Sequence, residues 1–159
     1  MTSTRTSAKQ PTRSVPAATP EDHLAYLLAR VHHRLQQAMD RALRTVDITP
    51  TQFYALAHIA QTPGLSGAEL ARALLTTPQA TATLIGRLTA AGLVERDRPG
   101  PGVSGAVSLT PAGRRRLRAA TTVAVDAEAA ALSSISRADQ RRVTTVLQSL
   151  LEGLERAPD

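Results

Sequence analysis

Thr followed by Pro recurs along this chain, and this pair constrains the fold more than any other feature of the sequence. A threonine hydroxyl accepts hydrogen bonds from the free N–H groups at a helix start, and proline at the first helical position loses no intrahelical hydrogen bond. Each pair therefore predicts that a helix begins at the proline. The pairs that precede apolar helical patterns are Thr19-Pro20, Thr49-Pro50, Thr77-Pro78 and Thr110-Pro111.

Two further helix starts lack proline but have the spacing of a capping box, in which a serine precedes an acidic residue by three positions. Ser66 precedes Glu69 in this way, and Ser136 precedes Asp139. Together these signals predict helices that begin near residues 20, 50, 67, 78, 111 and 137. The first helix is expected to end near residue 46 and to carry an apolar stripe of Leu24, Leu28, Val31, Leu35, Ala42 and Val46.

One stretch breaks the helical pattern. Residues 93–96 and 106–109 alternate between apolar and polar side chains, as strands do, and Gly92 ends the helix before them. The segment between them, residues 98–105, is rich in proline and glycine and can only form a turn-rich loop. This pattern predicts a small β-hairpin.

The composition supports a mainly α fold of about one domain. The 159 residues include 28 Ala and 20 Leu, the strongest helix formers, but only one Phe, two Tyr and no Trp. This bias disfavours a large sheet and a stacking surface for single-stranded nucleic acid. The absence of cysteine excludes disulfides and thiolate metal sites. No apolar segment reaches the roughly 18 residues of a membrane span and no signal peptide is visible, so a cytoplasmic protein is expected.

The net charge of +6 is concentrated in the middle of the chain. Residues 72–118 hold eight arginines and two acidic residues, whereas residues 119–159 hold four arginines and six acidic residues. Arginine suits phosphate groups and guanine edges better than lysine does. On its own, the charge is equally compatible with a solvated basic face.

Two short helices, predicted over residues 67–75 and 78–91, lie in this basic segment directly before the hairpin. That order is typical of a winged helix-turn-helix, in which the second helix enters the major groove of DNA. The buried stripe of the second helix should consist of Thr81, Leu84, Ile85 and Leu88. Its opposite face then presents Gln79, Ala80, Ala82, Thr83, Gly86 and Arg87, and Thr77 lies at the helix start.

The exposed face of the second helix has donors and acceptors that can read base edges directly. Gln79 suits adenine, Arg87 suits guanine or a phosphate, and Thr83 can bond to either. Ala80 and Ala82 offer methyl contacts to thymine or allow the backbone to approach. The alternative is an ordinary solvated helical face, but the helix-turn-helix spacing and the hairpin favour binding to double-stranded DNA.

Six short segments follow one another in a particular order: Ser66 to Leu74, Thr77-Pro78, Arg87-Leu88, Gly92 to Arg96, Leu109 to Gly113 and Leu132 to Asp139. In this order and at these spacings they resemble the MarR family of transcriptional regulators, over roughly residues 21–156. The resemblance implies a winged-helix homodimer that recognises a palindromic operator. It also implies a repressor that is commonly released by a small, often aromatic ligand.

The expected organisation has four parts. Residues 1–18, rich in Ser, Thr, Pro and Arg, are expected to be a disordered basic tail. The resemblance implies an N-terminal dimerisation helix in residues 19–48, the winged helix-turn-helix in residues 49–110 and C-terminal dimerisation helices in residues 111–157.

The resemblance also places an effector pocket between the dimerisation and DNA-binding regions, near Tyr26, His33, Phe53, Tyr54 and His58. Phe53 and Tyr54 suit the core equally well. The histidines lack the spacing of metal ligands, and no Ser-His-Asp, paired-carboxylate or glycine-rich phosphate motif is visible. We therefore expect no enzyme activity, no metal and no cofactor.

The chain departs from the family pattern in the recognition helix and in the wing. The family usually carries Thr-Arg where this chain has Ala82 and Thr83, and often an acidic residue in place of Gly86. The family's wing usually carries Asp-x-Arg, and the corresponding positions fall near Pro101 and Val103, so this wing tip is uncharged. These departures leave a second function open, a helical protein–protein adaptor or antirepressor of the same fold that does not read DNA.

Arg96 and Arg98, on the stem of the hairpin, are expected to replace the wing's contacts with phosphates or with a groove. The double variant Arg96→Ala with Arg98→Ala should weaken operator binding and flatten its salt dependence, because fewer counterions are released. A salt titration of the binding constant measures that slope. Unchanged binding would contradict this role.

Overall fold

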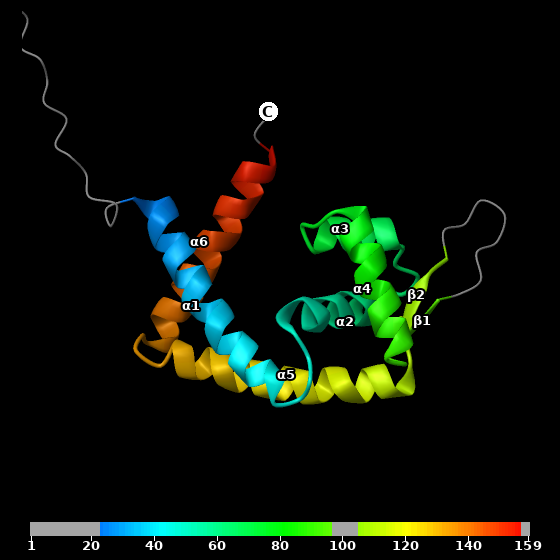
Figure 1. Cartoon of the computed structure of the whole chain (residues 1–159). Helices are drawn as coiled ribbons and strands as arrows, with labels where there is room; N and C mark the ends of the chain where they lie inside the picture. The colour runs from blue at the N-terminus through cyan, green and yellow to red at the C-terminus, as the bar shows by residue number, and fades with distance from the viewer. Residues whose placement is uncertain (1–22, 97–104, 157–159) are drawn as a thin grey trace, which may run out of the picture. The chain divides into compact units, whose positions relative to one another are not determined.

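The computed structural model describes residues 23–96 and 105–156, which form six helices and a two-stranded sheet (Figure 1). The last five helices begin at the predicted residues, whereas Thr19 and Pro20 lie outside the described residues. The mainly α fold class is confirmed. The helices are α1 (Leu24–Arg44), α2 (Pro50–Gln61), α3 (Gly67–Ala73), α4 (Pro78–Ala90), α5 (Pro111–Ala131) and α6 (Arg137–Arg156).

Side-chain capping explains where these helices start. The Thr49 hydroxyl accepts from the Gln52 N–H at 3.3 Å, and the Gln52 side chain accepts from the Thr49 N–H at 2.9 Å. Ser66 and Glu69 form the same reciprocal box at the start of α3, at 3.2 and 2.8 Å. Each box satisfies two N–H groups that the helix cannot satisfy itself, so the start is determined locally.

Three helices end with the same turn, in which one residue has a left-handed backbone conformation. That residue is Asp47 after α1, Leu75 after α3 and Gly92 after α4, with φ values of 51°, 52° and 68°. In each turn the N–H of the next residue donates to a carbonyl five residues back. These pairs are Ile48 to Leu43, Thr76 to Ala71 and Leu93 to Leu88, at 3.1, 3.0 and 2.9 Å.

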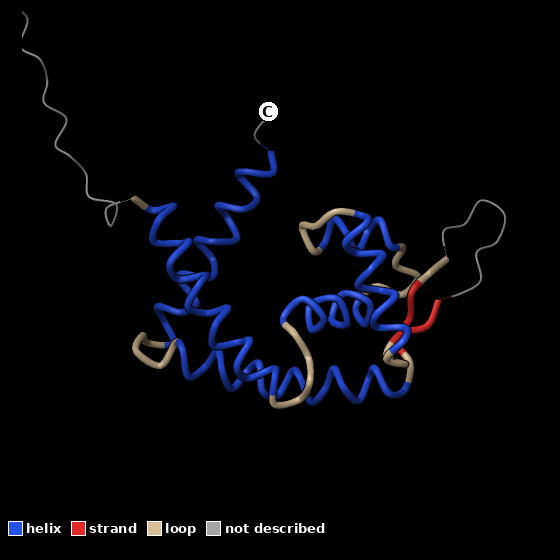
Figure 2. Tube along the Cα trace, viewed as in Figure 1, coloured by secondary structure: helices blue, strands red, loops and turns tan. Residues whose placement is uncertain are grey.

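The hairpin consists of β1 (Val94–Arg96) and β2 (Val107–Leu109), which pair antiparallel with Val94 opposite Leu109 (Figure 2). The strands are shorter than predicted, and the loop that joins them lies largely outside the described residues. The Val107 N–H also donates to the Leu65 carbonyl at 3.1 Å. The loop between α2 and α3 therefore ties the hairpin to the helix-turn-helix.

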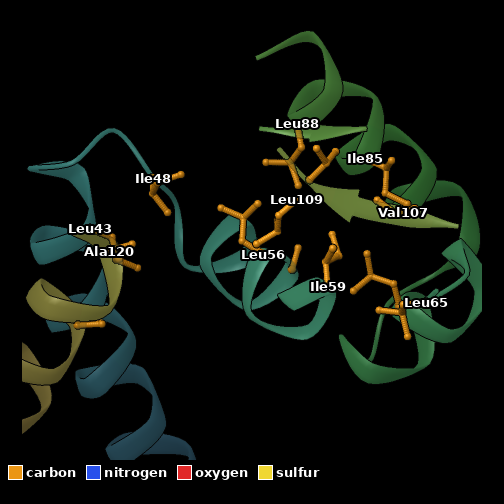
Figure 3. Close-up of a cluster of buried hydrophobic side chains, with 14 residues drawn as sticks. Leu43, Ile48, Leu56, Ile59, Leu65, Ile85, Leu88, Val107, Leu109 and Ala120 are labelled. Atoms are coloured by element: carbon orange, nitrogen blue, oxygen red, sulfur yellow. The ribbon is translucent and has the colours of Figure 1, made fainter. Parts of the chain in front are cut away.

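A cluster of buried aliphatic side chains joins the helices to the hairpin (Figure 3). Leu56 and Ile59 come from α2, Ile85 and Leu88 from α4, and Leu109 from β2. α2 contacts α5 and β2, and α4 contacts α3 and β1. α4 is thus held from one side only, which leaves its other side open to solvent.

The chain divides into two compact units inside α1, after His33. In the first unit, the Arg30 guanidinium lies over the Tyr26 ring, 5.7 Å from its centroid. In the second unit, Leu43 is the buried residue of α1, and the predicted stripe did not include it. α6 has no buried residue at all. No helix in the described ranges is long and apolar enough to cross a membrane.

The start of α5 is fastened to the end of α4 by one threonine. The Thr110 hydroxyl donates to the Gly92 carbonyl at 2.6 Å and accepts from the Gly113 N–H at 3.0 Å. The Thr110 N–H donates to the Leu93 carbonyl at 3.1 Å. A Cβ atom on Gly113 would lie 1.9 Å from the same Leu93 oxygen, so only glycine allows this approach.

Gly113→Ala should lower the free energy of unfolding by about 3 kcal/mol or more, because the new methyl group meets a backbone carbonyl that cannot move away. Thermal unfolding followed by circular dichroism measures this effect. Gly86→Ala in α4 is the matched control, since a Cβ there meets nothing within 4 Å. The control should raise the free energy of unfolding by up to about 1 kcal/mol. Equal midpoints for the two variants would contradict the packing argument.

Candidate nucleic-acid interface

α3, the turn at residues 74–77 and α4 form the helix-turn-helix that the sequence predicts. Thr81, Ile85 and Leu88 of α4 are buried and Leu84 is half-buried, which confirms the predicted stripe. The Thr81 hydroxyl is buried without a hydrogen-bond partner among the described residues. This stripe determines the rotation of α4 about its axis, and hence which residues face outward.

The opposite face of α4 is exposed along its length, and every predicted contact on it lies in solvent. It has no acidic residue, and most of its side chains are small. The exposed residues are Gln79, Ala80, Ala82, Thr83, Gly86 and Arg87. Such a face lets a nucleic-acid backbone come close while the longer side chains reach farther.

Two threonine hydroxyls on this surface already have partners. The Thr77 hydroxyl accepts from the Ala80 N–H at 3.2 Å and caps α4. The Thr83 hydroxyl donates to the Gln79 carbonyl at 3.1 Å. Thr83 therefore has only acceptor capacity left for a base edge, which suits the amino groups of adenine and cytosine.

The basic side chains of this region have different surroundings. Arg87 is exposed in the last turn of α4. Arg96 is exposed at the end of β1, and its Nη2 atom lies 4.0 Å from where a Cβ of Gly67 would be. The structure therefore brings Arg96 next to the start of α3. Arg98 lies outside the described residues.

The start of α3 also carries a carboxylate. Hydrogen bonds from the Ser66 hydroxyl and from the Ser66 N–H lower the pKa of Glu69, and the charge of Arg72 adds to this. Glu69 is therefore ionised at neutral pH, next to the positive end of the α3 dipole. Because its pKa is lowered on folding, its stabilising contribution is present at neutral pH and is lost as the pH falls through that pKa.

The arginines that begin α5 divide into two groups. Arg114 donates to the Leu109 carbonyl at 2.7 Å, and Arg116 donates to the Val46 carbonyl. Both side chains therefore stabilise the fold by bonding to backbone carbonyls of the same chain. Arg115 and Arg118 are exposed, so their guanidinium groups are accessible to phosphates.

The predicted effector residues lie in both units. Tyr26 and His33 belong to the first half of α1, and Phe53, Tyr54 and His58 belong to α2. The rings of Phe53 and Tyr54 are tilted, with centroids 5.4 Å apart, and Phe53 packs against the core. An effector site built from all five residues stays a prediction.

Comparison with known proteins identifies the family. A model described as "MarR family" matches residues 46–102. The HTH-type transcriptional repressor Rv2887 of Mycobacterium tuberculosis is 37% identical over 128 residues, covering 80% of this chain and 92% of that protein. The chain belongs to the MarR family. This membership confirms the predicted winged helix-turn-helix and places the chain among transcriptional regulators, not enzymes.

Solved structures of family members have the same fold. The complex of Rv2887 with DNA has a TM-score of 0.69 at 34% identity, covering 80% of this chain and 97% of that one. The complex of Rv2887 with salicylic acid has a TM-score of 0.68 at 36% identity, with coverages of 80% and 96%. The MepR–DNA complex of S. aureus has a TM-score of 0.72 at 25% identity, with coverages of 86% and 99%.

Sequence reasoning missed three residues that position this surface. Leu65 pairs with β2, Gly113 admits the close approach of α5, and Arg116 holds the turn after α1. The sequence did carry a signal for Gly113. Glycine is a poor helix former, so helix propensity does not explain a glycine three residues after a capping threonine. Leu65 and Arg116 act through contacts distant in sequence, which no local pattern reveals.

The turn of the helix-turn-helix contains an unfavourable residue. The sequence predicts Leu75 within a helix, but α3 ends at Ala73. Leu75 instead has φ 52° and is 95% exposed. A left-handed backbone costs a side chain with a Cβ roughly 1–2 kcal/mol relative to the usual conformation. Glycine at this position would avoid that cost.

Leu75→Gly should therefore raise the free energy of unfolding by about 1 kcal/mol, which thermal denaturation at fixed protein concentration measures. Leu75→Ala is the control, since alanine keeps the Cβ and its backbone strain while removing the exposed isobutyl group. Its midpoint should stay close to that of the wild type. A lower midpoint for Leu75→Gly would contradict the strain.

Proposed function

We propose that this chain is a homodimeric transcriptional repressor that binds a palindromic DNA operator with α4 in the major groove. The observation that carries the proposal is the outward face of α4, which the protein leaves exposed on a helix-turn-helix of this family. The concentration of positive charge in residues 72–118 supports it. So does the complex of the relative Rv2887 with DNA.

The homodimer is supported by the surface of α6. Its apolar side chains recur at intervals of three and four positions, as on a helix that buries one face. None of them is buried within the chain, and Val146, Leu151 and Leu154 are 59–64% exposed. A second copy of α6 and of its neighbours is the natural partner for such a face. Residues 119–159 carry more acidic than basic residues, which suits a dimerisation region away from DNA.

A small aromatic effector is the proposed signal. The relative Rv2887 has been crystallised with salicylic acid and with p-aminosalicylic acid. We propose that an aromatic carboxylate of this size modulates operator binding here, through the region of Tyr26, His33, Phe53, Tyr54 and His58. The histidines supply hydrogen-bond donors for a carboxylate and the aromatic rings supply stacking surfaces.

The adaptor or antirepressor remains the second candidate, and the small side chains on the outward face of α4 favour it. Ala80, Ala82 and Gly86 offer no hydrogen bonds to bases. Selection of bound duplexes from a randomised library separates the two functions. The repressor should enrich a palindrome, whereas the adaptor should enrich no sequence.

Arg87→Ala tests the residue that should contribute most to base reading. The variant should lose about tenfold or more in affinity for the selected operator and relax its preference at one base pair in each half-site, because a bidentate arginine contact is lost. Arg118→Ala is the matched control, since it removes the same charge from an exposed position on α5. It should shift affinity equally for all sequences. Wild-type affinity and preference in Arg87→Ala would contradict the proposed contact.

A further inference from the structure

The turn between α1 and α2 is held by a side chain that comes from α5. The turn joins Arg44, the last residue of α1, to Pro50, the first residue of α2. The left-handed Asp47 and the bond from Ile48 to Leu43 close it. The Val46 carbonyl at its apex is one of the oxygens that a helix end leaves without an intrahelical donor.

Arg116 supplies that donor. Its Nη1 atom donates to the Val46 carbonyl and lies 3.7 Å from the Asp47 carboxylate. The Arg116 side chain is 38% exposed, whereas that of Asp47 is 92% exposed. An ion pair so open to solvent contributes little, so the bond to the carbonyl is the main contact. A guanidinium also suits the negative end of the α1 dipole.

The second point of attachment lies one helical turn further along α5. Ala120, four residues after Arg116, is fully buried in the same cluster as Leu43 of α1 (Figure 3). Residues four apart share one face of a helix. The end of α1 therefore sits on α5 at two points, one polar and one apolar.

The attachment of the α1 end to α5 lies between the DNA-binding region and the proposed dimerisation region, and a dimeric repressor needs both. α2 starts directly after the turn and contacts α3, which with α4 makes the helix-turn-helix. From this point of attachment, α1 and α5 extend into the proposed dimerisation region. Since the turn joins them, its attachment to α5 constrains the path of the chain from α1 into α2.

We propose that Arg116 is a positioning residue that sets the separation of the two recognition helices in the dimer, and hence the half-site spacing that the operator must have. The proposal rests on the proposed function, since it needs a dimer bound to a palindrome. Each base pair added between half-sites moves them apart by about 3.4 Å and rotates one relative to the other by about 35°. A dimer in which this turn is firmly attached to α5 therefore distinguishes operators whose half-site spacings differ by one base pair.

The test compares three duplexes, the operator selected from a randomised library and versions with one base pair added or removed between its half-sites. Binding constants are measured for the full chain, for Arg116→Met and for Arg115→Met. Methionine keeps the apolar stem of arginine but removes its charge and donors. Arg115→Met is the matched control. It removes the same charge from the residue next to Arg116, and the Arg115 side chain is exposed.

The wild type should prefer the selected spacing by about tenfold or more, and Arg116→Met should reduce that preference at least threefold or move it to another spacing. Arg115→Met should leave the preference unchanged, whatever it does to affinity. Asp47→Asn keeps a residue that tolerates the left-handed backbone and should also leave the preference unchanged. If Arg116→Met does not fold, Arg116→Gln, which is too short to span the same gap, carries the same expectation.

The outcomes separate the proposals. A uniform loss of affinity at every spacing in Arg116→Met would mean a merely structural role and would overturn the inference, as would an unchanged preference. A wild-type protein that selects no palindrome would overturn the proposed function itself.

Discussion

Where α5 begins, the Thr110 hydroxyl joins the end of α4 to the start of α5, donating to the Gly92 carbonyl and accepting from the Gly113 N–H. The hairpin starts at this point, and the recognition helix ends there. Because Gly113 has no side chain, the first turn of α5 can lie against the Leu93 carbonyl. The end of α4, the first strand of the hairpin and the start of α5 thus meet at one place. A shift of any one of them displaces the other two.

The helix starts could be predicted because they depend on neighbours in sequence. A threonine or serine that bonds to an N–H three residues later needs nothing from the rest of the fold, and five of the predicted starts match the structure. The end of α3 could not be predicted in this way. Leu75 has good helix propensity but takes a left-handed conformation, because α4 must turn back onto α3. Leu43 is the buried residue of α1 because it packs in the same cluster as Ala120 of α5. The apolar periodicity of α1 alone does not reveal that packing.

The same distinction applies to the candidate interface. The outward face of α4 follows from helical periodicity once Ile85 and Leu88 are assigned to the core, so it could be predicted residue by residue. The arginines at the start of α5 could not be told apart in the sequence. In the structure, Arg114 and Arg116 turn back to backbone carbonyls, whereas Arg115 and Arg118 point to solvent. Charge in a sequence indicates the region of an interface, and hydrogen-bond partners distant in the chain decide which charges remain available to it.

The absence of any buried residue in α6 has a consequence for how this protein unfolds. A twenty-residue helix with no buried side chain gains little from its own chain, although helices in proteins draw most of their stability from packing one apolar face. If a second copy supplies the missing contacts, unfolding becomes a bimolecular equilibrium and its midpoint depends on protein concentration. Each tenfold dilution then removes about 1.4 kcal/mol of apparent stability per dimer. A repressor built this way is sensitive to its own abundance, since the pool of folded molecules shrinks faster than the total as copies are diluted by cell growth.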